Sequence, residues 1–194
     1  TFIIDTVAPS VVVTGIVHGG AYSPGVSAGI TVSDANLVSS VITIDGQPYV
    51  PGTPVLGEGP HALIVQAVDC AGNTASTTIA FLIDGTPSLV SIAVPACSSG
   101  PTLPIVTVTE ANVASDVRTL DGLPWDGQPV TAEGPHTLVV TVTDVTGHVT
   151  TASASFIVDS TPPVVTFAGV VDGAAYADTV TPQITVSAAN LTAT

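Results

Sequence analysis

The stretch EGPHTLVVTVTDVTGH at residues 133–148 has a near copy, EGPHALIVQAVDCAGN, at residues 58–73. The two stretches are identical at 8 of 16 positions and begin 75 residues apart. A segment that recurs at a fixed distance indicates that a structural unit has been duplicated, so the repeat period is established before any single residue is interpreted.

Apolar and polar residues alternate within this stretch. Leu138, Val140 and Val142 fall on one side of an extended chain, and the intervening residues fall on the other. Such a period of two, in segments rich in Val, Ile and Thr that end at Gly, Asp, Asn or Pro, is typical of β-strands. In the first copy the pattern predicts seven antiparallel strands that form a two-sheet sandwich: near 11–17, at 28–33, at 38–44, two short strands within 48–57, at 61–68 and at 74–83.

Further repeats divide the whole chain. TFIIDT (1–6) returns as AFLIDGTP (80–87) and SFIVDSTPP (155–163), so that Asp5, Asp84 and Asp159 are spaced by 79 and 75 residues. IDGQPY (44–49) likewise returns as LDGLPW (120–125). We therefore predict that residues 1–5 are the last strand of a preceding repeat, 6–84 and 85–159 are full repeats, and 160–194 are a partial third repeat, completed either by chain beyond this sequence or by strands from a neighbouring subunit.

The charge composition excludes several partners. Arg118 is the only strong base, Lys is absent, and fifteen Asp and Glu give a formal net charge of −14. Nucleic acid and anionic membranes bind clusters of Lys or Arg, so neither is an expected partner. No apolar run approaches the roughly 18 residues that span a bilayer, and membrane insertion is not expected. A divalent cation suits this composition better.

The combination of F-I-V-D-S-T-P-P, S-D-A-N-L, L-D-G-L-P and the twofold E-G-P-H stretch resembles the bacterial immunoglobulin-like (Big-type) tandem repeats of surface adhesins and extracellular fibre proteins. The resemblance covers the whole chain. It implies an all-β fold of tandem seven-stranded immunoglobulin-like sandwiches arranged end to end, located outside the cell or on its surface. In related adhesins, calcium binds at junctions between repeats, and the resemblance implies that the same could hold here.

Acidic residues recur at one pole of each repeat. The predicted topology places two loops at the same end as the incoming linker, so Asp5, Asp34 and Asp69 should converge in the first repeat. The matching residues of the second repeat are Asp84, Glu110 and Asp144. Two interpretations stay open: these oxygens are Ca²⁺ ligands, or they hydrogen-bond their own turns. The third repeat has Ala188 in place of the loop Asp and keeps only Asp159 and Asn190.

Repeated histidines do not indicate an enzyme. His61 and His136 follow Gly-Pro at the same corner, where we expect each ring to pack over the turn and bond to backbone. No nucleophile elbow and no metal-binding HExxH motif is present, so no catalytic residue is predicted. If the repeats lie end to end, Cys70 and Cys97 are too far apart for an intrachain disulfide. They are either unpaired or joined between chains.

These patterns predict a structural role. The linkers are short Asp-x-Thr-Pro segments, and Pro restricts both itself and the preceding residue to extended geometry. The leading hypothesis is a subunit or segment of an extracellular fibre, filament or adhesin stalk that self-associates or continues into neighbouring repeats. The alternative is an adhesive module that binds a surface receptor or glycan, with aromatic side chains as stacking platforms: Tyr22, Tyr49, Trp125 and Tyr176.

Overall fold

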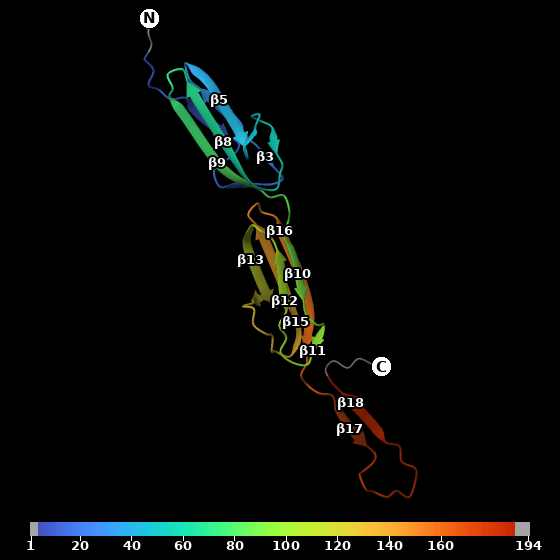
Figure 1. Cartoon of the computed structure of the whole chain (residues 1–194). Coiled ribbons are helices and arrows are strands. Elements are labelled where there is room, and N and C mark those ends of the chain that lie inside the picture. The colour runs from blue at the N-terminus through green and yellow to red at the C-terminus, as the bar shows by residue number, and fades with distance from the viewer. Residues whose placement is uncertain (1–3, 189–194) are drawn as a thin grey trace. The chain divides into compact units, whose positions relative to one another are not determined.

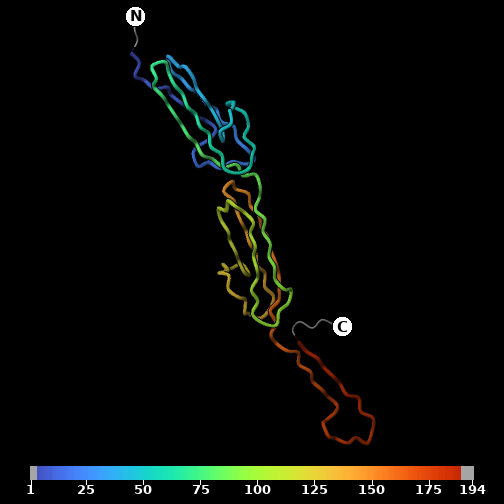
Figure 2. Tube along the Cα trace, in the orientation of Figure 1, coloured from blue at the N-terminus to red at the C-terminus, as the bar shows by residue number. Residues whose placement is uncertain are grey.

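A computed structural model describes residues 4–188, and Figures 1 and 2 show its path. All regular elements of the described residues are β-strands, so the all-β prediction is confirmed. Among the same residues there is no helix with the length and apolar character that crossing a bilayer requires. The chain forms two compact units, each with its own core. The predicted repeat boundaries and the end-to-end arrangement stay predictions.

The first unit contains the chain up to Ser88 together with the short segments Asn112–Ala114 and Thr143–Val149. Its strands are β1 (Ser10–Thr14), β2 (Gly20–Tyr22), β3 (Val26–Ser27), β4 (Gly29–Ser33), β5 (Leu37–Ile44), β6 (Gln47–Pro48), β7 (Pro54–Val55), β8 (Gly59–Asp69) and β9 (Thr74–Ile83).

Two layers of strands enclose the first core. One layer is a five-stranded sheet in the order β2-β9-β8-β5-β6, and the other contains the antiparallel pair β1-β4. Leu63 and Val65 of β8 are completely buried, and Val13 of β1 and Ile30 of β4 pack against the same cluster. Burial of such side chains stabilises the fold by roughly 1.5–3 kcal/mol each. The first unit is therefore a β-sandwich, and the alternation in the sequence correctly identifies its inward face.

The first predicted strand, near 11–17, differs from the structure. β1 ends at Thr14, and the chain then crosses to the other layer, where β2 pairs with β9 in parallel rather than antiparallel orientation. Gly15 makes the crossing possible, because its φ is 83° and a Cβ there would lie 2.3 Å from the carbonyl oxygen of Ser27. With β2 and the short β3 as additional segments, the repeat contains nine strand segments instead of seven.

The second repeat has the same sheet order and lies mostly in the second unit. Its strands are β10 (Leu89–Ala93), β11 (Cys97–Ser98), β12 (Ile105–Thr109), β13 (Val113–Leu120), β14 (Leu123–Pro124), β15 (Gly134–Asp144) and β16 (Val149–Val158). The five-stranded order β11-β16-β15-β13-β14 and the pair β10-β12 match those of the first unit. Leu138, Val140 and Val142 of β15 are completely buried in a separate core.

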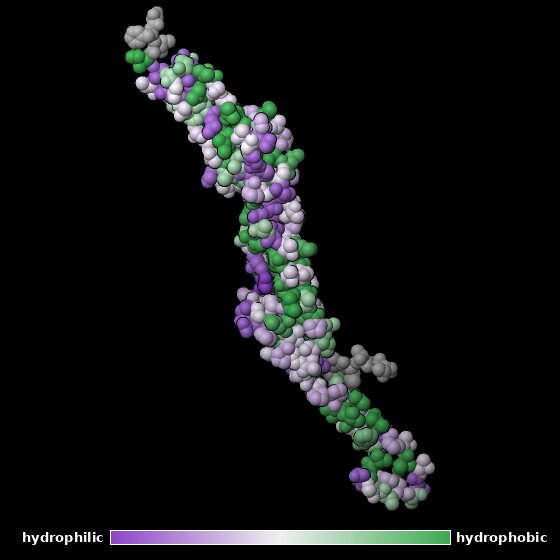
Figure 3. All heavy atoms as spheres, in the orientation of Figure 1, coloured by the Kyte–Doolittle hydropathy of each residue, from purple (hydrophilic) through white to green (hydrophobic). Residues whose placement is uncertain are grey.

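The third predicted repeat is represented by one hairpin, in which β17 (Val164–Ala168) pairs with β18 (Gln183–Ser187). All ten strand residues are exposed, and Figure 3 shows hydrophobic surface along this segment. Phe167 is 64% exposed. Residues 1–3 and 189–194, which include Asn190, lie outside the described part.

Candidate functional site

The structure brings together three of the predicted metal ligands. Asp5, Asp34 and Asp69 each offer a carboxylate oxygen, and these oxygens all lie within 4.8 Å of one another. Asp5 lies in the incoming segment, Asp34 follows β4, and Asp69 is the last residue of β8. Asp69 is buried and the other two are half-buried. It is the one group of this kind among residues 4–188, and carboxylate oxygens are ligands that hard cations such as Ca²⁺ and Mg²⁺ accept.

Two asparagines hold this acidic group in place. The Asn36 amide donates to Asp5 Oδ2 at 3.1 Å, and the Asn73 amide donates to Asp69 Oδ2 at 2.7 Å. Asn73 also donates to the carbonyl oxygen of Asp5 at 3.2 Å. Burial acts to raise the pKa of Asp69, but hydrogen bonds from Asn73 and from neighbouring backbone amides outweigh it and lower the pKa. Asp69 is thus ionised at neutral pH, and the two asparagines hold its carboxylate close to that of Asp5.

Some of these carboxylate oxygens also accept hydrogen bonds from backbone N–H groups of their own turns. Asp34 Oδ1 accepts the backbone N–H of Asn36 at 2.8 Å, and Asp69 Oδ1 accepts those of Ala71 and Asn73, both at 2.9 Å. These are the bonds expected from Asp in a turn. Each carboxylate has further lone pairs, so turn formation and cation binding are compatible in this group.

The acidic residues of the second repeat are arranged differently. Asp84, Glu110 and Asp144 do not form an equivalent metal-binding group among the described residues. Asp84 Oδ2 accepts the amide of Asn112 at 3.1 Å. Asp144 Oδ2 lies 2.7 Å from Nδ1 of His148, which occupies the sequence position of Asn73. The physical difference is therefore a basic ring where the first repeat has a neutral amide.

Asp144 is the most strongly perturbed acid of the chain. Its side chain is fully buried. Burial acts to raise its pKa, but hydrogen bonds from His148 and from the hydroxyl and backbone amide of Thr146 lower it to about 2. A carboxylate held by this many donors fixes the turn after β15 and is not available as a proton donor or acceptor at neutral pH.

The two corner histidines occupy equivalent sites. His61 Nε2 lies 2.6 Å from the carbonyl oxygen of Gly57, and His136 Nε2 lies 2.8 Å from that of Ala132. The predicted backbone bond is therefore present in both repeats. The rings also stack on Phe81 and Phe156, with centroid distances of 5.4 and 5.6 Å.

Sequence reasoning missed the second partner of each histidine. Nδ1 of His61 lies 2.6 Å from Asp45 Oδ2, and Nδ1 of His136 lies 2.7 Å from Asp121 Oδ2. Both aspartates begin Asp-Gly hairpin turns and have φ of 51°. Their other oxygens accept the backbone amides of Ala62 and Thr137, each at 2.8 Å. The recurring Asp-Gly pair predicts a turn, but it does not predict the contact between the aspartate and the histidine.

A second missed feature is a glutamate that binds the chain after the last strand. Glu58 accepts the backbone N–H of Gly85 at 3.0 Å, and Glu133 accepts that of Ser160 at 3.1 Å as well as its hydroxyl. Both glutamates belong to the repeated E-G-P-H segment. The sequence signal for this glutamate was that it stands at the same distance before the histidine in both copies.

The aromatic residues of the glycan-binding hypothesis form hydrogen bonds with backbone groups of other residues in the chain. The hydroxyl of Tyr49 accepts the N–H of Ala28 at 3.0 Å and donates to the carbonyl of Thr53 at 2.7 Å. Trp125 donates to the carbonyl of Gln128 at 3.0 Å, and both rings pack against the cores. Tyr22 and Tyr176 likewise accept backbone N–H groups through their hydroxyls. These contacts indicate packing roles for Tyr22, Tyr49 and Trp125, whereas Tyr176 is 44% exposed and lies in neither core.

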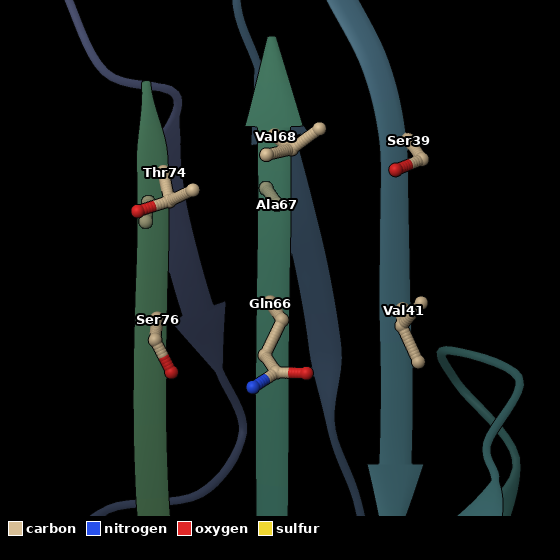
Figure 4. Close-up of a pocket in the computed structure, with 8 residues that line it drawn as sticks. Ser39, Val41, Gln66, Ala67, Val68, Thr74 and Ser76 are labelled. Carbon is tan, nitrogen blue, oxygen red and sulfur yellow. The ribbon is translucent and has the colours of Figure 1, made fainter. Parts of the chain in front are cut away.

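Neither the cysteines nor a hollow on the sheet of the first unit offers a catalytic arrangement. Cys70 and Cys97 are both unpaired and exposed. A hollow of about 500 Å³ lies on the outward face of β5, β8 and β9, and Figure 4 shows the small and polar side chains that line it. They are Ser39, Val41, Gln66, Ala67, Val68, Thr74, Ala75 and Ser76. None of these residues titrates near neutral pH.

No protein family model and no curated protein sequence matches the chain. Among solved structures, the fibronectin(III)-like modules of Clostridium thermocellum CbhA match with a TM-score of 0.38 and 15% identity, over 77% of this chain and 94% of that one. Dimeric latent PorU from Porphyromonas gingivalis matches with a TM-score of 0.33 and 14% identity. That match covers 81% of this chain and 21% of PorU. Likenesses this distant do not assign a family.

Proposed function

We propose that the chain is a structural segment of an extracellular or cell-surface fibre or adhesin stalk, built from tandem immunoglobulin-like sandwiches. The observation that carries the proposal is the duplication of a whole set of internal bonds. The bond between His61 and Asp45 recurs between His136 and Asp121. The bond from Glu58 to the backbone after the last strand recurs at Glu133. A duplicated framework of packing and turn contacts is what a repeated structural module needs.

The short linkers support this role. Gly85 follows the last strand of the first repeat directly, and its backbone N–H is bound by Glu58. Asp84, the residue before it, accepts the amide of Asn112 through its side chain and the hydroxyl of Thr146 through its carbonyl oxygen. Bonds of this kind reduce the conformational freedom of the residues that leave the last strand of the first repeat. A short outgoing segment held in this way is what the proposal expects of a stalk.

Electron microscopy of the native material is the direct test of the structural role. The proposal expects elongated stalks or fibres. Compact particles that bind a receptor without forming any elongated structure would contradict it. The material should be imaged with and without a chelator, because a bound cation at the acidic pole would add to the stiffness.

We also propose that Asp5, Asp34 and Asp69 bind one Ca²⁺ ion in the first repeat. The convergence of three carboxylates supports this, because each carboxylate repels its neighbours unless a cation compensates their charge. Calcium at 100 times its dissociation constant should stabilise the folded first unit by about 2.7 kcal/mol.

The calcium proposal is tested by thermal unfolding with Ca²⁺ and with EDTA. Asp34→Asn should remove most of the calcium-dependent increase in melting temperature, because it deletes a charged ligand from a half-buried position. Asp126→Asn is the matched control, since Asp126 lies outside the group. Equal calcium responses in both variants, or none in the unmodified chain, would show that the acids serve only as turn residues.

A further inference from the structure

Each corner histidine faces a hydrogen-bond acceptor at both ring nitrogens. The His61 ring lies between the carbonyl oxygen of Gly57, 2.6 Å from Nε2, and the Asp45 carboxylate, 2.6 Å from Nδ1. The distances for His136 are 2.8 Å to Ala132 and 2.7 Å to Asp121. The same arrangement occurs in both repeats, so it is a property of the module.

Only a protonated ring can make both bonds. A carbonyl oxygen and an ionised carboxylate accept hydrogen bonds and cannot donate them. A neutral imidazole carries a single N–H, whereas the imidazolium carries two. The two distances at His136 lie in the range of charge-assisted bonds, about 2.7–2.9 Å, and the two at His61 are slightly shorter. The geometry of each corner therefore fits an imidazolium.

The corner places this cation beside an anion and away from solvent. The side chains of His61 and His136 are 12% and 8% exposed. Burial acts to lower the pKa of His61, but the bonds to Gly57 and Asp45 outweigh it and raise the pKa above 6.5. For His136, the bond to Asp121 is the largest cause of a raised pKa, followed by the bond to Ala132.

The other charged groups around the rings are also acidic. Near His61, the Glu58 carboxylate is engaged by the N–H of Gly85. Near His136, Asp126 lines the same cavity of about 360 Å³, and Glu133 is engaged by Ser160. The single guanidinium of the second unit, Arg118, is paired with Asp116 at 2.6 Å. The carboxylates that raise the pKa of the two rings are therefore those in direct contact with them, Asp45 and Asp121.

We propose that these two corners are acid-stabilised locks, which hold the loops before β8 and β15 while the imidazole is protonated and release them when it loses its proton. The proton passes to solvent, and the remaining N–H stays with the carboxylate, which is the stronger acceptor. The carbonyl oxygen of Gly57 or Ala132 then loses its donor. Glu58 directly follows Gly57, and Glu133 directly follows Ala132, so the released loop also carries the glutamate that binds the outgoing linker.

The pH range follows from linkage. A group whose pKa is higher in the folded than in the unfolded chain adds stability that is complete below the unfolded value, near 6.5, and is lost as pH rises through the folded value. The pKa of Asp45 is lowered, because the bonds from His61 and Ala62 outweigh burial; that of Asp121 is lowered chiefly by His136. The aspartate contribution is lost only in acid, below about pH 4. Each lock is therefore fully formed between about pH 4 and about pH 6.5.

The first test is a nitrogen-15 NMR titration of the full chain. The expected result is that the rings of His61 and His136 titrate above 6.5 and show two ring N–H protons at about pH 6. His18 is an internal comparison, because its Nδ1 accepts the backbone N–H of Ala80 and cannot carry a proton in that bond. Corner rings that titrate at or below 6.5, or that show a single N–H, would overturn the proposal.

The second test measures thermal unfolding between about pH 6 and pH 9. The melting temperature of the unmodified chain should fall as pH rises. His61→Gln with His136→Gln should flatten this dependence, whereas His18→Gln should retain it. An unchanged slope in the double variant would refute the lock. If that variant does not fold, the NMR titration of the unmodified chain decides the question alone.

Discussion

Truncation of a fully buried leucine should show that the two cores unfold independently. Leu138 is 0% exposed at the centre of the second core, and Leu63 is its 0% exposed counterpart in the first. Leu138→Ala removes three carbon atoms and leaves a cavity that rigid strands can fill only in part. The expected loss is about 3 kcal/mol, within the roughly 2–5 kcal/mol found for such truncations. For a module of this size, it corresponds to a fall in melting temperature of roughly 12–24 °C.

Differential scanning calorimetry of the full chain is the appropriate assay. Leu138→Ala should lower the transition of the second unit and leave that of the first in place, and Leu63→Ala should do the reverse. Leu123→Ala is the matched control, because Leu123 is 71% exposed and its truncation should change stability by less than about 0.5 kcal/mol. A single transition that both core variants lower equally would refute the idea of two independent cores.

Two further substitutions test polar contacts. Tyr49→Phe should destabilise the first unit by about 1–2 kcal/mol, because the N–H of Ala28 loses its acceptor inside the sandwich. Urea unfolding measures this loss of stability. An unchanged unfolding midpoint would show that water replaces the hydroxyl. Asp144→Asn should cost about 1–2 kcal/mol at neutral pH, because it removes the charge that the surrounding donors stabilise. Because the pKa of Asp144 falls to about 2 on folding, this contribution exists above 3.8 and is lost as pH decreases towards 2. Acid unfolding should therefore be less steep in Asp144→Asn than in Asp126→Asn, and identical curves would contradict the assignment.

The sequence was sufficient to identify the strands that carry the core. β8 and β15 were predicted correctly because alternation, flanking Gly-Pro and duplication all agree in those segments. The crossing after Thr14 was not predictable from alternation. VVVTGIV reads as one continuous strand, and only the close approach of the Ser27 carbonyl to Gly15 reveals that the chain must change layers there.

At the acidic pole, topology determines which residues lie close together, while their role as metal ligands stays a prediction. Asp5, Asp34 and Asp69 converge because two loops and the incoming segment meet at one end of the sandwich. Analogy could not predict the second pole, since one substitution, from Asn73 to His148, changes the partner of the equivalent aspartate. The Asp-His contacts at the corners were missed for a related reason: they join residues 15 or 16 positions apart through side chains, which periodicity does not report.

The histidine corner and the acidic pole differ in how far their residues vary between the two repeats. The corner keeps the same Asp, His and Phe in both repeats, because an altered member would leave a buried donor or acceptor unpaired. The pole changes from Asp69 with Asn73 to Asp144 with His148. His148 places a ring nitrogen 2.7 Å from the Asp144 carboxylate, whereas Asp69 lies beside two further carboxylates, those of Asp5 and Asp34. Like charges held this close repel one another unless a cation compensates them, so the calcium proposal is strongest at the first pole.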